Sequence, residues 1–179
     1  DLRRTIVLTG TRRVGKTTIQ YQMIDRLLKK GIPPQKILFV SMDHPMLKLS
    51  GLNDLLECYH SNVYAEQDCY YFFDEIQYAS DWDKWMKTIY DMQPETKMVA
   101  TGSASPALMK GSSESGAGRW SVIQVPTLSF YEYCALIGAK VPELGPEIRP
   151  TAFLHMAQQE RTAVMIKLEE VQNYFMRYL

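Results

Sequence analysis

The sequence predicts a three-layer α/β fold with a mainly parallel sheet of five strands, followed by C-terminal helices. Short apolar or β-branched runs alternate with helical patterns five times along the chain, which is typical of parallel sheets whose crossovers are helices. In addition, a glycine turn follows the first run, two acids end the third and a glycine and a serine follow the fourth. These are the places where ligands bind in open α/β sheets.

The strands are expected where apolar runs are short and bounded by turn residues. They are expected at residues 5–9, 36–43, 69–76, 97–101 and 120–126. The run at 69–76 is apolar at nearly every position until it ends in acids, as expected of a strand buried on both faces.

The helices are expected where apolar residues recur at spacings of three and four. The first begins at Lys16 and is stopped by Gly31, and a weaker pattern covers residues 47–59. A stripe containing Trp82 and Trp85, which we interpret as core, follows a cap at Ser80 or Asp81 and ends before Pro94. A capping box at Ser129 and Glu132 opens the next helix, and one or two more follow residue 150.

These patterns divide the chain into a core at residues 1–140, a linker at 141–150 and helices at 151–179. Residues 111–118 are rich in Gly and Ser, so we expect a mobile loop there. Because the chain begins at Asp1 instead of Met and ends within a helical pattern, we expect it to be a piece of a longer protein.

The composition is that of an ordinary globular protein. The 179 residues are 46% hydrophobic and 22% charged with zero net charge, which excludes a disordered chain and a global basic footprint for nucleic acid. Three cysteines without a C-x-x-C spacing favour buried free thiols, and a metal site of Cys58, His60 and Cys69 is disfavoured because no fourth ligand suggests itself. No apolar run approaches the ~20 residues that span a bilayer, and no signal peptide opens the chain, so we expect a cytoplasmic protein without a membrane partner.

The zero net charge hides an uneven distribution. The balance is +7 for residues 1–36, −8 for 37–95 and +1 for 96–179. Either charges cluster by chance on solvated faces, or a basic phosphate-facing segment precedes an acidic metal-facing one.

A phosphate-binding pattern follows the first strand. The chain matches G-x-x-x-x-G-K-[ST] and its next residue with Gly10, Thr11, Arg12, Arg13, Val14, Gly15, Lys16, Thr17 and Thr18. Glycines let successive backbone N–H groups curl around a polyphosphate at a helix N-terminus. Lys16 is then expected to reach the β- and γ-phosphates, and Thr17 to give its hydroxyl to Mg²⁺.

The acids that end the third strand are the expected partners of this loop. Asp74 is placed to hold the Mg²⁺ shell and Glu75 to polarise an attacking water, although a lone pair of solvated acids is common. Asp74 lies 58 positions after Lys16, which leaves room for a further strand between them and makes the fourth strand a neighbour of both. Its end then places Ser103 near the γ-phosphate, with an ordinary turn hydroxyl as the alternative.

Three arginines have two interpretations each. Arg119 follows the flexible segment and is a candidate for neutralising charge on a γ-phosphate, in its own subunit or a neighbour's, or it is a solvated strand edge. Arg12 and Arg13 contact nucleotide or a partner, or they are simply exposed to solvent.

Taken in order, several segments resemble prokaryotic AAA-type ATPases, a family of bacterial and archaeal predicted ATPases. The segments are the loop from Gly10 to Thr18, residues 72–77 with the sequence FFDEIQ followed by Asp81 and Trp82, residues 101–103, residues 117–119 and residues 128–132. The resemblance covers about residues 3–133. It implies an ATPase core with Asp74 and Glu75 as metal and base pair, Ser103 in the sensor position and Arg119 as the charge-stabilising arginine. Members usually continue into a further C-terminal domain.

The leading hypothesis is therefore Mg²⁺-dependent ATP binding and hydrolysis that drives a conformational switch. The alternative is a nucleotide-gated scaffold or DNA-associated regulator with little hydrolysis, motivated by the basic first segment. A GTPase is disfavoured because no guanine-reading motif of the N-K-x-D type is found, and no acceptor pattern indicates a small-molecule kinase. A protein partner or a second copy of the chain is expected at the face that carries Arg119, and DNA is left open.

Overall fold

The computed structural model describes residues 4–48, 51–103, 118–144 and 150–178. The chain forms two compact units, Asp1–Thr127 and Leu128–Leu179. The expected core reached residue 140, whereas the first unit ends before the helix that the capping box opens. The loop expected at 111–118 falls, except for Gly118, outside the described residues, as does the 145–149 part of the expected linker.

The first unit contains one parallel sheet of five strands. Its strands are β1 (Thr5–Gly10), β2 (Ile37–Ser41), β3 (Tyr70–Asp74), β4 (Lys97–Ser103) and β5 (Trp120–Gln124). The strand order is β2-β3-β4-β1-β5, with every neighbouring pair parallel. β4 therefore separates β1 from β3 and neighbours both, as the spacing of the motifs predicted.

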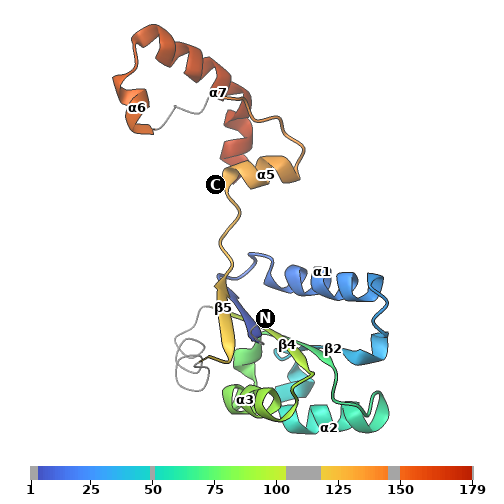
Figure 1. The fold of residues 1–179 in the computed structure, drawn as a ribbon. Coiled ribbons are helices and arrows are strands. Elements are labelled where there is room, and N and C mark those ends of the chain that lie inside the picture. Colours follow the sequence, from blue (N-terminus) through green and yellow to red (C-terminus); the bar gives the residue numbers. More distant parts are fainter. Residues whose placement is uncertain (1–3, 49–50, 104–117, 145–149, 179) are drawn as a thin grey trace. The chain divides into compact units, whose positions relative to one another are not determined.

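Helices cover both faces of this sheet, so the predicted three layers are confirmed (Figure 1). They are α1 (Lys16–Lys29), α2 (Leu52–Asn62) and α3 (Trp82–Met92), with 3-10 turns η1 (Pro34–Lys36), η2 (Pro45–Lys48) and η3 (Ile76–Tyr78). The apolar side of α1 packs on Leu8, Phe72 and Val99, whereas α2 and α3 pack on the opposite face, where Tyr71 and Phe73 are fully buried. Alternation along β3 thus supplies both cores, as expected of a strand that is buried on both sides.

Three local features differ from the expectation. β3 ends at Asp74, because Glu75 adopts a left-handed conformation with φ 51° and a 3-10 turn follows. α2 begins only at Leu52. Asp81 also has positive φ, and its carboxylate accepts a hydrogen bond from Lys84 Nζ at 2.7 Å instead of capping α3.

The second unit is helical. It contains α5 (Phe130–Leu136), α6 (Pro150–His155) and α7 (Gln158–Tyr178). The predicted capping box is present, since Glu132 N donates to Ser129 Oγ at 3.2 Å and Ser129 N donates to Glu132 Oε2 at 2.8 Å. Phe130 of α5 packs edge-on against Phe175 of α7, with ring centroids 5.1 Å apart. Among the described residues, no helix has the length and apolar character needed to cross a membrane.

Candidate functional site

The loop between β1 and α1 has the backbone that the glycine pattern predicted. Gly10, Arg13 and Gly15 all have positive φ, so the backbone changes direction at these positions before α1 begins. A Cβ atom on Gly10 would lie 2.5 Å from the carbonyl oxygen of Val125, which no side chain can tolerate. Gly10 is therefore required by the close approach of the chain after β5.

Lys16 is the first residue of α1, directly after this loop, and is only 5% exposed. Its Nζ donates to the carbonyl oxygens of Gly10 at 3.1 Å and Thr11 at 2.9 Å. Among the described residues, no carboxylate forms an ion pair with it. A buried ammonium held only by neutral carbonyls keeps its positive charge available for an anion. The adjacent N-terminus of α1 also favours an anion at this place.

The third strand brings a carboxylate to the same place. Thr17 Oγ1 donates to Asp74, with distances of 2.9 Å to Oδ2 and 3.1 Å to Oδ1. Asp74 is 5% exposed, and Thr101 Oγ1 of β4 donates to its Oδ1 at 2.5 Å. The sequence thus predicted correctly that Thr17 and Asp74 meet, but it did not single out Thr101 as a partner of Asp74.

The donor set suits a magnesium ion. Thr17 and Asp74 offer hard oxygen atoms, and their separation is close to the ~2.9 Å edge of an octahedron with metal–oxygen bonds of about 2.0–2.1 Å. No group of three or more His, Cys, Asp or Glu side chains gathers for a metal among the described residues. Mg²⁺ does not need one, because it keeps waters and shares phosphate oxygens.

Glu75, Gln77 and Ser103 form a second group beside Asp74. The backbone N–H of Glu75 donates to Thr101 Oγ1 at 3.0 Å, so the same hydroxyl holds both acids. Gln77 Nε2 donates to Glu75 Oε2 at 2.5 Å and lies 3.4 Å from Ser103 Oγ. Ser103 ends β4 in register with Gly10 of β1. The structure therefore brings the predicted base and the predicted sensor together.

A buried glutamine ties α1 to the strands below it. Gln20 is fully buried, and its Nε2 donates to the carbonyl oxygens of Phe73 at 3.2 Å and Val99 at 3.3 Å. These bonds fix the first turn of α1, which carries Lys16 and Thr17, over β3 and β4. Its position one turn after Lys16 was the only sequence signal for this role.

The remaining residues of the loop face outward. Thr11, Arg12, Arg13 and Thr18 are exposed, and Val14 is partly buried. Arg12 Nη2 lies 3.4 Å from the hydroxyl of Tyr78. Both loop arginines are exposed in the chain alone, and their contact with nucleotide or a partner stays a prediction.

Arg119 lies at the other edge of the sheet. It directly precedes β5, and its carbonyl accepts from Thr5 N at the start of β1. Because all strands are parallel, the length of β1 separates it from the loop at Gly10. Its guanidinium donates to Asp91 at 2.9 and 3.2 Å, which raises its pKa above the ordinary value. A role for Arg119 in its own subunit's site does not fit this fold, because Arg119 lies at the amino edge of the sheet and the Gly10 loop at the carboxyl edge.

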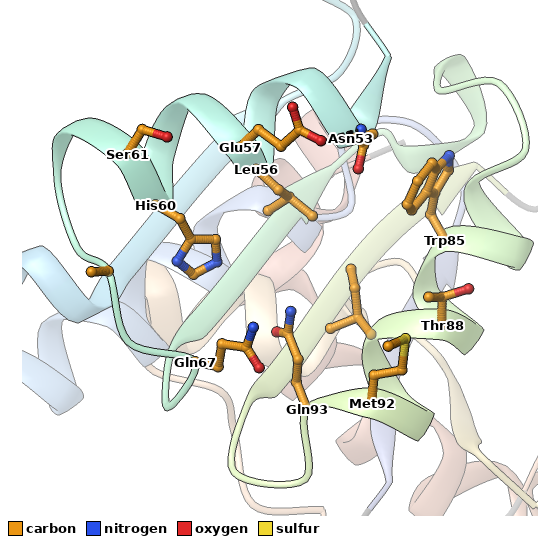
Figure 2. A pocket seen from close by; sticks show the side chains of 12 residues that line it. Asn53, Leu56, Glu57, His60, Ser61, Gln67, Trp85, Thr88, Met92 and Gln93 are labelled. Carbon is orange, nitrogen blue, oxygen red and sulfur yellow. Dashed lines mark hydrogen bonds between the residues drawn. The ribbon is translucent and has the colours of Figure 1, made fainter.

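A groove of about 530 Å³ lies between α2 and α3, away from the loop. Figure 2 shows side chains from the two helices lining it, among them His60 and Trp85. His60 is engaged by Tyr71, whose hydroxyl lies 2.7 Å from its Nε2, and by the carbonyl of Tyr64. The groove contains none of the predicted site residues.

The cysteines differ in burial. Cys69 is buried, but Cys58 is exposed, which corrects the expectation that the thiols are all buried.

Comparisons with known proteins show the family of the chain and support its fold. A family model described as an AAA domain matches residues 2–134. The chain belongs to this AAA domain family. Membership assigns it in general terms to the nucleotide-binding ATPases.

The relatives are longer proteins. An uncharacterised protein of Methanocaldococcus jannaschii is 33% identical over 153 residues, which is 83% of this chain and 31% of that protein. An uncharacterised protein of Haemophilus influenzae is 29% identical over 131 residues, 71% of this chain and 32% of that protein. The chain thus spans about a third of the length of these relatives.

Solved structures share the fold at low sequence identity. The Aeropyrum pernix ORC2 protein, solved with ADPNP and ADP, has a TM-score of 0.52 at 14% identity and covers 76% of this chain and 45% of its own. A DNA replication initiation factor has a TM-score of 0.50 at 13% identity and covers 96% of this chain and 56% of its own. They support the AAA-type fold.

Proposed function

We propose that this chain binds ATP with Mg²⁺ and hydrolyses it, and that hydrolysis drives a conformational switch. One observation carries the proposal. At the carboxyl edge of the sheet, a buried lysine without an acidic partner among the described residues lies next to a threonine that contacts a buried aspartate. An anion and a divalent cation bound together, as in Mg²⁺-ATP, complement both charges.

The roles of the chain's own groups follow from their positions. The N–H groups of the loop and the N-terminus of α1 hold the phosphates, and Lys16 neutralises the charge of the β- and γ-phosphates. Thr17 and Asp74 would hold Mg²⁺, which when bound supplies Lewis-acid screening of the phosphate oxygens.

Glu75 is the proposed base. Its carboxylate takes a proton from the water that attacks the γ-phosphorus, while ADP leaves with the β–γ bridging oxygen. Ser103, at the end of β4, offers a hydroxyl to the γ-phosphate. Thr101 keeps Asp74 and Glu75 in fixed relation, because it bonds to both.

Two substitutions test the proposal. In Lys16→Ala we expect nucleotide affinity and turnover to fall together, whereas in Glu75→Gln we expect turnover to fall about 100-fold or more with affinity retained. Binding is measured with a fluorescent nucleotide and turnover by phosphate release. Lys29→Ala, which changes an exposed lysine of the same helix, is the matched control. Parental turnover in both variants would show that the assignment is wrong.

A second candidate is a nucleotide-gated regulator that associates with DNA and hydrolyses slowly. It is favoured by exposed arginines at the loop and on α1, namely Arg12, Arg13 and Arg26, and by structural neighbours named as an ORC2 protein and a DNA replication initiation factor. Titration of labelled DNA at several salt concentrations tests it. A steep loss of affinity with salt supports contacts to phosphates, and absence of binding at low salt contradicts it.

A further inference from the structure

Gln77 lies on the 3-10 turn after β3 and has no assigned role in the proposed hydrolysis. Glu75 has φ 51° and ψ 48°, a left-handed conformation that is strained for a non-glycine residue. The 3-10 turn that follows is held by the hydrogen bonds Tyr78 N to Glu75 O at 3.1 Å and Ala79 N to Ile76 O at 2.9 Å. Ile76 is fully buried and anchors the turn in the core. The chain is thereby folded back so that Gln77 lies beside Glu75.

The amide of Gln77 contacts the Glu75 carboxylate and the Ser103 hydroxyl at the carboxyl edge of the sheet. Its Nε2 donates to Glu75 Oε2 at 2.5 Å and lies 3.4 Å from Ser103 Oγ. This orientation of the amide is the favourable one, because the opposite orientation would place a carbonyl oxygen against a carboxylate. The other end of the amide, Oε1, is buried and has no hydrogen-bond partner among the described residues.

We propose that Gln77 is a positioning residue for hydrolysis: it holds the Glu75 carboxylate in one orientation and couples it to Ser103 of β4. The inference rests on the proposed function, since Glu75 acts there as the base. Two N–H donors of a single amide reach a carboxylate on the turn after β3 and a hydroxyl at the end of β4. The buried Oε1 remains as an acceptor, suited to a water beside Glu75.

The test is a double-mutant cycle between Gln77 and Glu75 in the full 179-residue chain. In Gln77→Ala we expect kcat to fall about tenfold or more, because a hydrogen bond to a charged group is lost, while KM and nucleotide affinity stay unchanged. In the Glu75→Gln background the same change should cost nothing further. Residual turnover is measured in single-turnover experiments with excess protein. Gln77→Glu, which cannot donate to a carboxylate, should lose as much as the alanine variant and serves if Gln77→Ala does not fold.

The outcomes separate this inference from the function on which it rests. Gln22→Ala, which changes an exposed glutamine of α1, should leave kcat unchanged. Equal additive losses in both backgrounds would indicate a merely structural role and overturn the inference. Unchanged kcat in the Gln77 variants, with turnover still dependent on Glu75, would overturn it and leave the proposed function intact. Absence of Glu75-dependent turnover in the wild-type chain would overturn both.

Discussion

The two edges of the sheet treat charged side chains in opposite ways. At the amino edge, charges meet charges: Arg119 pairs with Asp91 at 2.9 Å, and Lys36 pairs with Asp68. At the carboxyl edge, buried Asp74 is held by the hydroxyls of Thr17 and Thr101. There, buried Lys16 is held by two carbonyl oxygens.

The charges at the amino edge are paired with opposite charges of the chain, whereas those at the carboxyl edge have neutral hydrogen-bond partners. A carboxylate held by hydroxyls and an ammonium held by carbonyls are desolvated without being neutralised. Folding alone gains little from such groups, so their retention points to a ligand with both signs of charge. The ion pairs at the amino edge need no ligand, because each charge already has its partner in the chain.

The largest expected effect removes the negative charge at the carboxyl edge. Asp74→Asn keeps an oxygen that can accept from Thr101, so we expect the free energy of unfolding not to fall. Turnover should fall about 1,000-fold, since metal screening contributes several kcal/mol to the barrier. Phosphate release at increasing Mg²⁺ and urea unfolding measure the two quantities.

Asp43→Asn is the matched control for this variant. Asp43 is exposed shortly after β2 and accepts from Ser41 Oγ at 2.7 Å, so its charge is solvated and turnover should be unchanged. A parallel loss of stability and turnover in Asp74→Asn would contradict the interpretation that Asp74 is kept for a ligand.

The next effect breaks the shape of the carboxyl edge. In Gly10→Ala the new Cβ meets the Val125 carbonyl oxygen at 2.5 Å, whereas in Gly15→Ala nothing lies within 4 Å and only the strain of φ 94° remains. We expect Gly10→Ala to lower the free energy of unfolding by about 2–4 kcal/mol and Gly15→Ala by about 1–2 kcal/mol. Urea unfolding checks the order, and equal losses would contradict the role assigned to the Val125 contact.

A smaller effect is expected at Thr101, which joins the two acids. Thr101→Val keeps the shape but leaves Asp74 and the Glu75 N–H each without this partner. We expect a loss of about 1–3 kcal/mol in the free energy of unfolding and a higher Mg²⁺ requirement for turnover. Thr88→Val is the control, at an exposed threonine whose hydroxyl donates to the carbonyl oxygen of Lys84 within α3. A loss of stability without any change in Mg²⁺ requirement would limit Thr101 to a structural role.

The carboxyl edge could be predicted from the sequence because its chemistry is written in contiguous motifs. The strand positions followed from short apolar runs, and the placement of β4 between β1 and β3 and the contact between Thr17 and Asp74 followed from the spacing of these motifs. The roles of Gln20 and Thr101 could not be predicted, because their hydrogen-bond partners lie far away in the sequence. Their side chains are ordinary in sequence and become informative only through register.

The amino edge was less predictable for a related reason. An arginine after a segment rich in Gly and Ser has the same sequence signal whichever edge of the sheet it occupies, and only the parallel direction of β5 decides. At the carboxyl edge one boundary was misjudged: β3 ends two residues earlier than predicted, because the left-handed conformation of Glu75 has no signal in a run that continues to Ile76.

Arg119 can be tested for an action at the carboxyl edge of a second copy of the chain. Arg119→Ala should change the free energy of unfolding by about 1 kcal/mol or less, because its partly exposed ion pair contributes little. We propose that it acts on the nucleotide of a second copy. Mixing Arg119→Ala with Lys16→Ala chains should then restore part of the turnover that each lacks alone. No restoration, with Arg119→Ala fully active alone, would leave Arg119 as an ion pair only.

The smallest expected effect concerns the second ion pair of the amino edge. Hydrogen bonds from Lys36 and Tyr64 lower the pKa of Asp68 below its ordinary value of 3.8. The pair therefore stabilises the fold above pH 3.8, and this contribution is lost as the pH falls through the lowered pKa. Asp68→Asn removes the charge but keeps an acceptor for the Tyr64 hydroxyl. Its urea midpoint should lie slightly below that of the wild type at neutral pH, and the gap should close in acid. A gap that persisted after protonation would show that Asp68 contributes through packing instead of charge, and the contrast between the two edges would then rest on Arg119 and Asp91 alone.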